Sequence, residues 1–327
     1  MRKAALALAV FVLFTALALP AGGEEAVLPR ADRDESYYML AFNSDIEYWQ
    51  QCYAGFQRSA AIYGARTEFD GILNANSGEY ADLIRSIIVK KPSGLAIAAT
   101  YSEEIDAAIR EAMDAGIPVV TYDADAPASG RLCYLGIDNY AAGATAAAFL
   151  AGEMEHTGEI AIIGGNLERG DGQQYERVKG FVDHIESYEP GMRVVAIENG
   201  NADALRTAQE ALTVLEEHPN VSGLYTTSAQ MSSGIATAIE QSGRVGEIKA
   251  VGFDTDEATL EAIEEGVLTG TISQGTEAMG FWAFQILFMV HNSLAIDHWQ
   301  EYEFLPLPTQ MDIGVTVVTA ENIDLFR

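Results

Sequence analysis

Short apolar runs alternate with amphipathic segments along most of the chain. Every residue of the run from Ile160 to Ile163 is apolar, which is typical of a strand buried on both faces. By contrast, Ile105, Ala108 and Ala112 recur at helical spacing. Strands that alternate with such helices build parallel sheets covered on both faces.

This strand–helix pattern runs through the chain twice. The predicted strands lie at 37–43, 66–70, 94–99, 117–122 and 133–137, and then at 159–163, 193–197, 221–225, 248–253 and 268–273. Ten strands exceed one comfortable sheet. The sequence therefore predicts an α/β fold with two doubly wound parallel-sheet lobes.

The end of the chain completes both lobes. An apolar helix at 276–292 is expected to pack back on the first lobe, and 312–319 is expected to form a final strand. The chain would then cross between the lobes near Asp138, Gln274 and Met311, which makes a three-strand hinge. The expected N-terminal lobe is 37–138 plus 275–308, and the expected C-terminal lobe is 139–274 plus 309–327.

The first residues have the layout of a secretory signal. Arg2 and Lys3 precede an apolar run at 4–19, and small residues follow up to Gly23. This arrangement predicts a cleaved signal peptide at 1–23 and a periplasmic or secreted protein. The run is short for a membrane span, so a retained anchor is the less favoured alternative. No cysteine near the cut offers a lipid attachment point, and the charged residues 24–36 are expected to be an exposed leader.

Charge and cysteine content exclude several classes. The formal charge of −29 argues against nucleic acid, because phosphate binding needs clustered Lys and Arg. The five histidines are scattered and no metal-ligand spacing is present, so neither a metal nor a cofactor is expected. Cys52 and Cys133 belong to one predicted lobe, and either a disulfide or two buried thiols would fit.

Candidate ligand residues follow from the sheet architecture, because ligands of parallel α/β sheets bind beyond the carboxyl ends of the strands. The segments at those ends are rich in carboxylates, amides, hydroxyls and aromatic rings. They are 43–49, 100–103, 123–125, 138–139, 166–175, 198–201, 227–230, 253–254 and 273–276. This mixture suits a neutral, polyhydroxylated ligand.

Other interpretations compete at single positions. Aspartates after strands often cap the next helix, as expected for Asp256. Trp49 lies on the apolar stripe of its helix, so core packing is an alternative there, whereas Tyr48 lies off that stripe. No G-x-S-x-G or H-E-x-x-H motif is present, so no catalytic residue is assigned. Paired carboxylates of a glycosidase stay open as an alternative.

Several of these segments resemble the ribose-binding protein family of periplasmic sugar-binding proteins, over roughly 37–323. The order and spacing of the matches carry the resemblance. The matches are Tyr48–Trp49, V-V-T-Y-D at 119–123, G-I-D-N at 136–139, R-V-K-G-F at 177–181, V-G-F-D at 251–254, T-I-S-Q at 271–274, and D-I-G-V-T-V-V-T at 312–319. The resemblance implies a type I periplasmic binding protein-like fold.

The resemblance also implies roles for the matched residues. Aromatic rings would sandwich a sugar, and polar groups would bond its hydroxyls. The aromatic set is Tyr48, Trp49 and Phe253, and the polar set is Asp123, Asp254 and Gln274.

Three positions depart from the ribose binders. Ala124 and Tyr175 stand where those proteins carry arginines, and Ser228 stands where they carry an asparagine. Tyr175 and Ser228 stay candidate ligand residues. Glu47 is an extra acidic candidate, as are the nearby Asp45 and Asp125. The departures leave another pentose, a hexose, a cyclitol or a cationic ligand open.

The implied function is capture without chemistry. A monomeric extracytoplasmic protein would bind a monosaccharide or polyol between its lobes and deliver it to an ABC permease with an ATPase partner. A sugar sensor for a chemotaxis or signalling receptor and an exported carbohydrate hydrolase are the alternatives. No nucleic-acid partner is expected.

Overall fold

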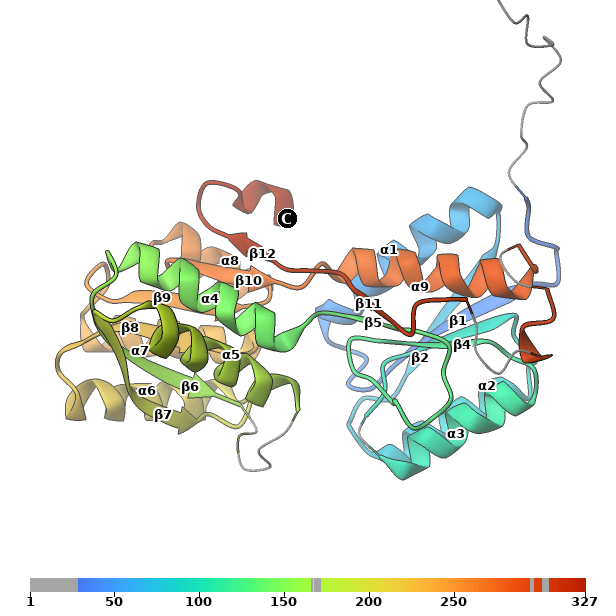
Figure 1. Cartoon of the computed structure of the whole chain (residues 1–327), viewed down its shortest axis with the longest axis horizontal. Helices are drawn as coiled ribbons and strands as arrows, with labels where there is room; N and C mark the ends of the chain where they lie inside the picture. The colour runs from blue at the N-terminus through green and yellow to red at the C-terminus, as the bar shows by residue number, and fades with distance from the viewer. Residues whose placement is uncertain (1–28, 101, 166, 168–171, 295–296, 302–305) are drawn as a thin grey trace, which may run out of the picture.

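The computed structural model of the chain describes residues 29–327, except 101, 166, 168–171, 295–296 and 302–305. The predicted signal peptide lies outside the described residues. The described chain forms two α/β lobes that lie side by side along the long axis of the molecule (Figure 1). The two predicted lobes are thus confirmed.

The first lobe contains a sheet in the order β11-β5-β4-β3-β1-β2, with all neighbours parallel. Its strands are β1 (Ser36–Ala41), β2 (Arg66–Gly71), β3 (Gly94–Ile97), β4 (Val119–Tyr122), β5 (Tyr134–Gly136) and β11 (Gln310–Asp312). Helices α1 (Glu47–Tyr63) and α9 (Thr276–His291) pack together on one face, and α2 (Ser77–Ile88) and α3 (Glu103–Asp114) pack together on the other. The return of α9 to the first lobe agrees with the prediction.

The second lobe repeats this plan with the strand order β12-β10-β9-β8-β6-β7. Its strands are β6 (Gly158–Gly164), β7 (Met192–Asn199), β8 (Val221–Thr226), β9 (Lys249–Phe253), β10 (Gly270–Ser273) and β12 (Thr316–Val318). Helices α4 (Asn139–Glu153) and α5 (Gln173–Tyr188) cover one face. The other face holds α6 (Ala204–Glu217), α7 (Ala229–Ser242) and α8 (Glu257–Glu264). Short 3-10 helices lie at Trp299–Glu301 and Ile323–Phe326.

Close packing of α4 on α5 depends on two glycines. A Cβ at Gly143 would lie 1.9 Å from the carbonyl oxygen of Arg177, and one at Gly180 would lie 2.0 Å from that of Tyr140. Only glycine permits backbones to approach so closely. This contact fixes the height of α5 against the sheet, and with it the position of Arg177 near the carboxyl ends of the strands.

The first two lobe crossings lie where they were predicted, between β5 and α4 and between β10 and α9. The third differs. The expected single strand at 312–319 is two strands: β11 pairs with β5 in the first sheet, and β12 runs antiparallel to β10 in the second. The crossing therefore falls at 313–315, shortly after the predicted position near Met311 and later than the predicted lobe boundary at 309. Gly314 turns the chain there with φ +74°.

The leader is shorter than the predicted 24–36. β1 begins at Ser36, and Glu35 before it is only 6% exposed. Its carboxylate accepts hydrogen bonds from the Tyr37 hydroxyl at 2.7 Å and from the backbone N–H of Asp32 at 2.9 Å. Hydrogen bonding compensates the burial of this charge. Cys52 and Cys133 are both buried and free.

Candidate ligand-binding site

The first-lobe half of the site joins α1 to the end of β4. The Tyr48 hydroxyl, in the first turn of α1, donates a hydrogen bond of 2.7 Å to Oδ1 of Asp123. Asp123 directly follows β4 and has a left-handed backbone with φ +59°. Non-glycine residues with such a φ are uncommon and cluster at functional sites. The turn carries the Asp123 side chain off the edge of the sheet.

Trp49 packs inside the first lobe beside this pair. Its ring lies edge-on to Phe42, Tyr48 and Tyr122, with centroid separations of 5.4, 5.0 and 5.7 Å. The residue is only 4% exposed, and its indole Nε1 has no hydrogen-bond partner among the described residues. A buried donor without a partner is costly unless water or a ligand satisfies it.

The second-lobe half is organised around Arg177. This guanidinium is 4% exposed, and it lies 3.9 Å from the ring centroid of Phe253. Its nitrogens donate to Asn139 Oδ1 at 2.8 Å, to the Thr227 carbonyl at 2.8 Å and to Gln274 Oε1 at 3.1 Å. Arg177 thus ties the first crossing, the end of β8 and the second crossing together.

Asp254 follows β9 and also has a left-handed backbone, with φ +69°. Its Oδ1 accepts a 2.6 Å hydrogen bond from Gln274 Nε2. Ser228 occupies the N-cap position of α7 without a side-chain capping bond. It is 8% exposed, yet its Oγ has no hydrogen-bond partner in the part of the chain that the structure describes. Gln274 is therefore a bridge between Arg177 and Asp254, and Ser228 adds a second unpaired buried group.

The two halves influence each other electrostatically. Burial raises the pKa of Asp123 from its ordinary value of 3.8 to about 6; the nearby charge of Asp254 also raises it, while Tyr48 and Arg177 lower it. Burial likewise raises the pKa of Asp254, against the opposing charge of Arg177. Arg177 is also linked to Asp254 through Gln274. Among the described residues, one carboxylate from each lobe thus lies near the Arg177 guanidinium.

Two candidates from the sequence lie outside this cluster. Glu47 is exposed and lines a groove of about 970 Å³ between α1, α8, the second crossing and the C-terminal residues. Tyr175 lies in the first turn of α5, partly exposed, without a hydrogen bond to another described residue. Whether either contacts a ligand stays a proposal.

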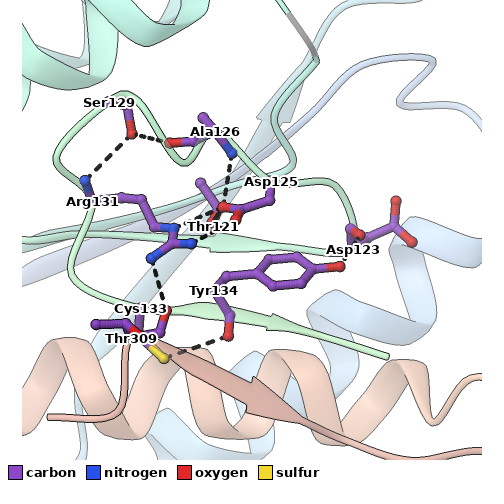
Figure 2. Close-up of polar contacts among 9 residues, drawn as sticks. All are labelled: Thr121, Asp123, Asp125, Ala126, Ser129, Arg131, Cys133, Tyr134 and Thr309. Carbon is purple, nitrogen blue, oxygen red and sulfur yellow. Dashed lines mark hydrogen bonds and ion pairs between the residues drawn. The ribbon is translucent and has the colours of Figure 1, made fainter. Parts of the chain in front are cut away.

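Asp125 serves the structure of the first lobe (Figure 2). Its carboxylate pairs with Arg131 at 2.7 and 2.5 Å and also accepts from the Thr121 hydroxyl at 2.7 Å. Burial raises the pKa of Asp125, but these donors outweigh it and the net pKa is lowered. Both carboxylate oxygens of Asp125 thus already accept hydrogen bonds from protein donors, unlike those of a carboxylate that is free to bind a ligand.

Sequence reasoning missed two residues, Arg177 and Gln173. Arg177 stood within the quoted R-V-K-G-F segment, and a basic residue in a helix that starts at strand ends was the available signal. Gln173 begins α5, and its Nε2 donates to the main-chain carbonyl of Asp123 in the other lobe. No sequence pattern distinguished Gln173 from other surface amides.

Within the described ranges, the chain has neither a metal-binding cluster nor a membrane-spanning helix. No group of three or more His, Cys, Asp or Glu side chains there could hold a metal ion. In the same part of the chain, no helix is long and apolar enough to span a membrane.

Comparison with known proteins shows which family has this architecture. A model of the periplasmic binding protein domain matches residues 37–293. A crystal structure of a sugar ABC transporter sugar-binding protein from Bacillus halodurans is 36% identical, with a TM-score of 0.85 over 90% of this chain and 100% of that one. The arabinose-binding protein AraP of Geobacillus stearothermophilus is 35% identical, with a TM-score of 0.84 over 90% and 99%.

Among curated relatives, the D-ribose/D-allose-binding protein of Pseudomonas aeruginosa is 28% identical over 65% of this chain and 66% of its own length. An architecture of two lobes joined by three chain crossings, with a polar site between the lobes, is that of a solute-binding protein. The chain belongs to the ribose-binding protein family of type I periplasmic binding proteins. Members of this family are transport components, so the chain is a sugar-binding protein and not an enzyme.

Proposed function

We propose that the chain captures one neutral monosaccharide between Asp123 and Asp254 and hands it, unaltered, to an ABC permease with its ATPase. The observation that supports this most is that each lobe ends a strand with a partly buried carboxylate, Asp123 after β4 and Asp254 after β9. Gln173 of the second lobe also donates to the main-chain carbonyl of Asp123. A ligand that bonds both carboxylates bridges the lobes and favours their closure.

The chemistry of the site suits a hydroxylated guest. Carboxylate acceptors bind hydroxyl donors strongly, and the unpaired Trp49 Nε1 and Ser228 Oγ are ready to bond hydroxyl oxygens. Tyr48 is proposed to offer an aromatic surface for the C–H face of a sugar ring. Phe253 is fully buried with Arg177 over its ring, so it supports the site from beneath. The guanidinium of Arg177 already neutralises part of the acidic charge, which disfavours the cationic ligand that the sequence left open.

The proposed ligand class is an aldopentose or hexose. Proteins similar to this chain are named for arabinose, and for ribose and allose. The two arginine positions of the ribose binders hold Ala124 and Tyr175 here, so a sugar other than ribose is favoured. Tyr175 and Glu47 are proposed to reach the sugar from the rim.

Location and partners follow from the family and from the first residues of the chain. The signal-like segment at 1–23 supports export with cleavage, and the family supports an extracytoplasmic location. The proposed protein acts in the periplasm as a monomer. A permease would recognise the closed lobe pair, which a bound sugar stabilises further.

The energetics are adequate for transport. Micromolar affinity corresponds to about −8 kcal/mol. Hydrogen bonds to charged groups contribute about 1.5–3 kcal/mol each and neutral ones about 0.5–1.5 kcal/mol. Two carboxylates, an indole, an amide and a hydroxyl can therefore supply this free energy together with ring stacking.

A thermal-shift screen tests the proposal. The purified mature chain is heated with D-ribose, D-allose, D-arabinose, L-arabinose, D-xylose, D-galactose, myo-inositol and a polyamine control. We expect at least one monosaccharide to raise the melting temperature, and NMR of that sugar to show no chemical change. Stabilisation by the polyamine alone, or cleavage of a sugar conjugate, would contradict the proposal.

A further inference from the structure

Gln173 connects the lobes without taking part in the carboxylate pair. Its Nε2 donates a 2.5 Å hydrogen bond to the main-chain carbonyl oxygen of Asp123. The Asp123 side chain stays available to the ligand. We propose that Gln173 is a latch, a positioning residue that stabilises the closed lobe pair whichever sugar is bound; this rests on the proposed function.

The acceptor of the latch is held firmly by the first lobe (Figure 2). The same Asp123 carbonyl also accepts the Tyr134 hydroxyl at 2.7 Å. The loop beyond Asp123 is fixed because Arg131 binds Asp125 and donates from Nη1 to the Thr309 carbonyl at 2.7 Å. Because the acceptor is already ordered, the Gln173 bond loses little of its free energy to ordering that loop.

The donor is equally well placed. Gln173 is the first residue of α5, whose close contact with α4 fixes the helix. The next side chain, Gln174, is bonded inside its own lobe, where its Oε1 accepts from the Thr227 hydroxyl at 3.0 Å. Two adjacent amides thus have different tasks: Gln174 stabilises the second lobe, and Gln173 reaches across to the first.

The Gln173 hydrogen bond should change the affinity for every ligand by the same factor. A contact that exists only in the closed state shifts the open–closed equilibrium by its own free energy, whichever ligand is bound. A neutral hydrogen bond changes such an equilibrium about 2- to 10-fold. Loss of the latch therefore lowers the affinity for every sugar by one common factor. Loss of a ligand contact, by contrast, lowers the affinities for different sugars by different factors.

The test compares Gln173→Ala and Gln173→Glu with the wild type. Gln209→Ala is the matched control, because Gln209 is an exposed amide on α6 of the same lobe. Dissociation constants are measured by calorimetry for every sugar of the panel D-ribose, D-allose, D-xylose, D-arabinose and D-galactose that the wild type binds. Small-angle scattering of the sugar-free proteins gives the radius of gyration.

We expect Gln173→Ala to lower the affinity for every bound sugar by the same factor of about 2 to 10. The variant should also have a larger radius of gyration than the wild type when no sugar is present. Gln173→Glu has a larger effect because it sets a carboxylate against the carbonyl, and Gln209→Ala has none. If Gln173→Ala lowers the affinities for different sugars by different factors, or leaves them unchanged, the proposal that Gln173 is a latch is wrong. If no sugar binds the wild type, the proposed function fails, and the sugar-free scattering alone then decides the latch.

Discussion

The Tyr48 hydroxyl and the Asp123 carboxylate form a 2.7 Å hydrogen bond that joins the first turn of α1 to the end of β4. This bond orients a carboxylate whose pKa burial has raised to about 6. Tyr48 keeps its proton, because burial and the adjacent Asp123 raise the pKa of its phenol well above the ordinary value. The phenol is therefore a donor throughout the accessible pH range.

Sugar affinity should depend on pH through Asp123. Hydroxyl donors need the ionised carboxylate, so affinity falls as the pH drops below about 6, by up to tenfold per unit. Without sugar the sign is opposite: the folded state holds this proton more tightly than the unfolded chain, so the contribution of Asp123 to stability declines as pH rises from about 4 to 6. Calorimetry from pH 5 to 8 and urea unfolding from pH 4 to 7 measure the two effects. An inflection near pH 6 that persists in Asp123→Asn would contradict the assignment.

Asp254→Asn should strongly reduce sugar-induced thermal stabilisation while the fold stays intact. Asparagine tolerates the left-handed backbone of φ +69° at this position, whereas alanine would add strain. Replacing a charged acceptor removes about 1.5–3 kcal/mol per hydrogen bond to sugar, or about 10- to 150-fold in affinity. Differential scanning fluorimetry with and without the best sugar gives the result. Full stabilisation of the variant by that sugar would remove Asp254 from the site.

Ser228→Ala should affect folding and binding in opposite directions. Its buried hydroxyl has no hydrogen-bond partner among the residues that the structure describes, so its removal leaves the free energy of unfolding unchanged or raises it by up to about 1 kcal/mol. Affinity for the sugar nevertheless falls about 2- to 10-fold, because the hydroxyl loses its bond to the ligand. Chemical unfolding and calorimetry on one preparation separate the two quantities. Equal affinity of variant and wild type would show that Ser228 does not contact the sugar.

Two substitutions of Trp49 should separate its role in core packing from its role as a hydrogen-bond donor. Trp49→Phe keeps a ring among Phe42, Tyr48 and Tyr122 but deletes the unpaired indole N–H. We expect a loss of affinity with little change in stability, whereas Trp49→Ala costs about 3–5 kcal/mol of stability through the cavity it leaves. Melting temperatures without sugar, set beside dissociation constants, distinguish the two roles. A Trp49→Phe variant with wild-type affinity would assign Trp49 to the core alone.

Arg177→Met should destabilise the protein more at pH 8 than at pH 5. Arg177 lowers the pKa of both Asp123 and Asp254, and without it two partly buried carboxylates lack a counter-charge. Removing one partner of a buried charge arrangement costs about 3–5 kcal/mol. At pH 5 protonation of the carboxylates relieves much of this cost. Arg177→Lys, which keeps the charge but not the planar fork, should show a smaller pH dependence; urea unfolding of both variants at the two pH values measures it.

Sequence patterns predicted the lobes well because buried strands are continuous apolar runs. The run at β6 and the fully buried β3 and β4 carry this signal. The last strand was predicted as one because β11 and β12 have only three residues each, and β11 (Gln310–Asp312) has only one apolar residue to mark it. Periodicity shows that residues are extended, but it does not show to which sheet they belong.

The site was predictable in part for a similar reason. Residues at strand ends such as Asp123 and Asp254 follow from the topology of parallel sheets. Arg177 and Gln173 act from within a helix, through partners in other segments, and only three-dimensional packing reveals them. Asp125 looked like a further ligand carboxylate, since Arg131 lies six residues away and the sequence does not show their pairing.

A crystal structure of the mature chain with its tightest-binding monosaccharide tests the central claim most directly. We predict one sugar molecule between the lobes, with hydroxyls within hydrogen-bond distance of both the Asp123 and the Asp254 carboxylates. A sugar bound by one lobe alone, or lodged in the groove beside Glu47, would contradict it.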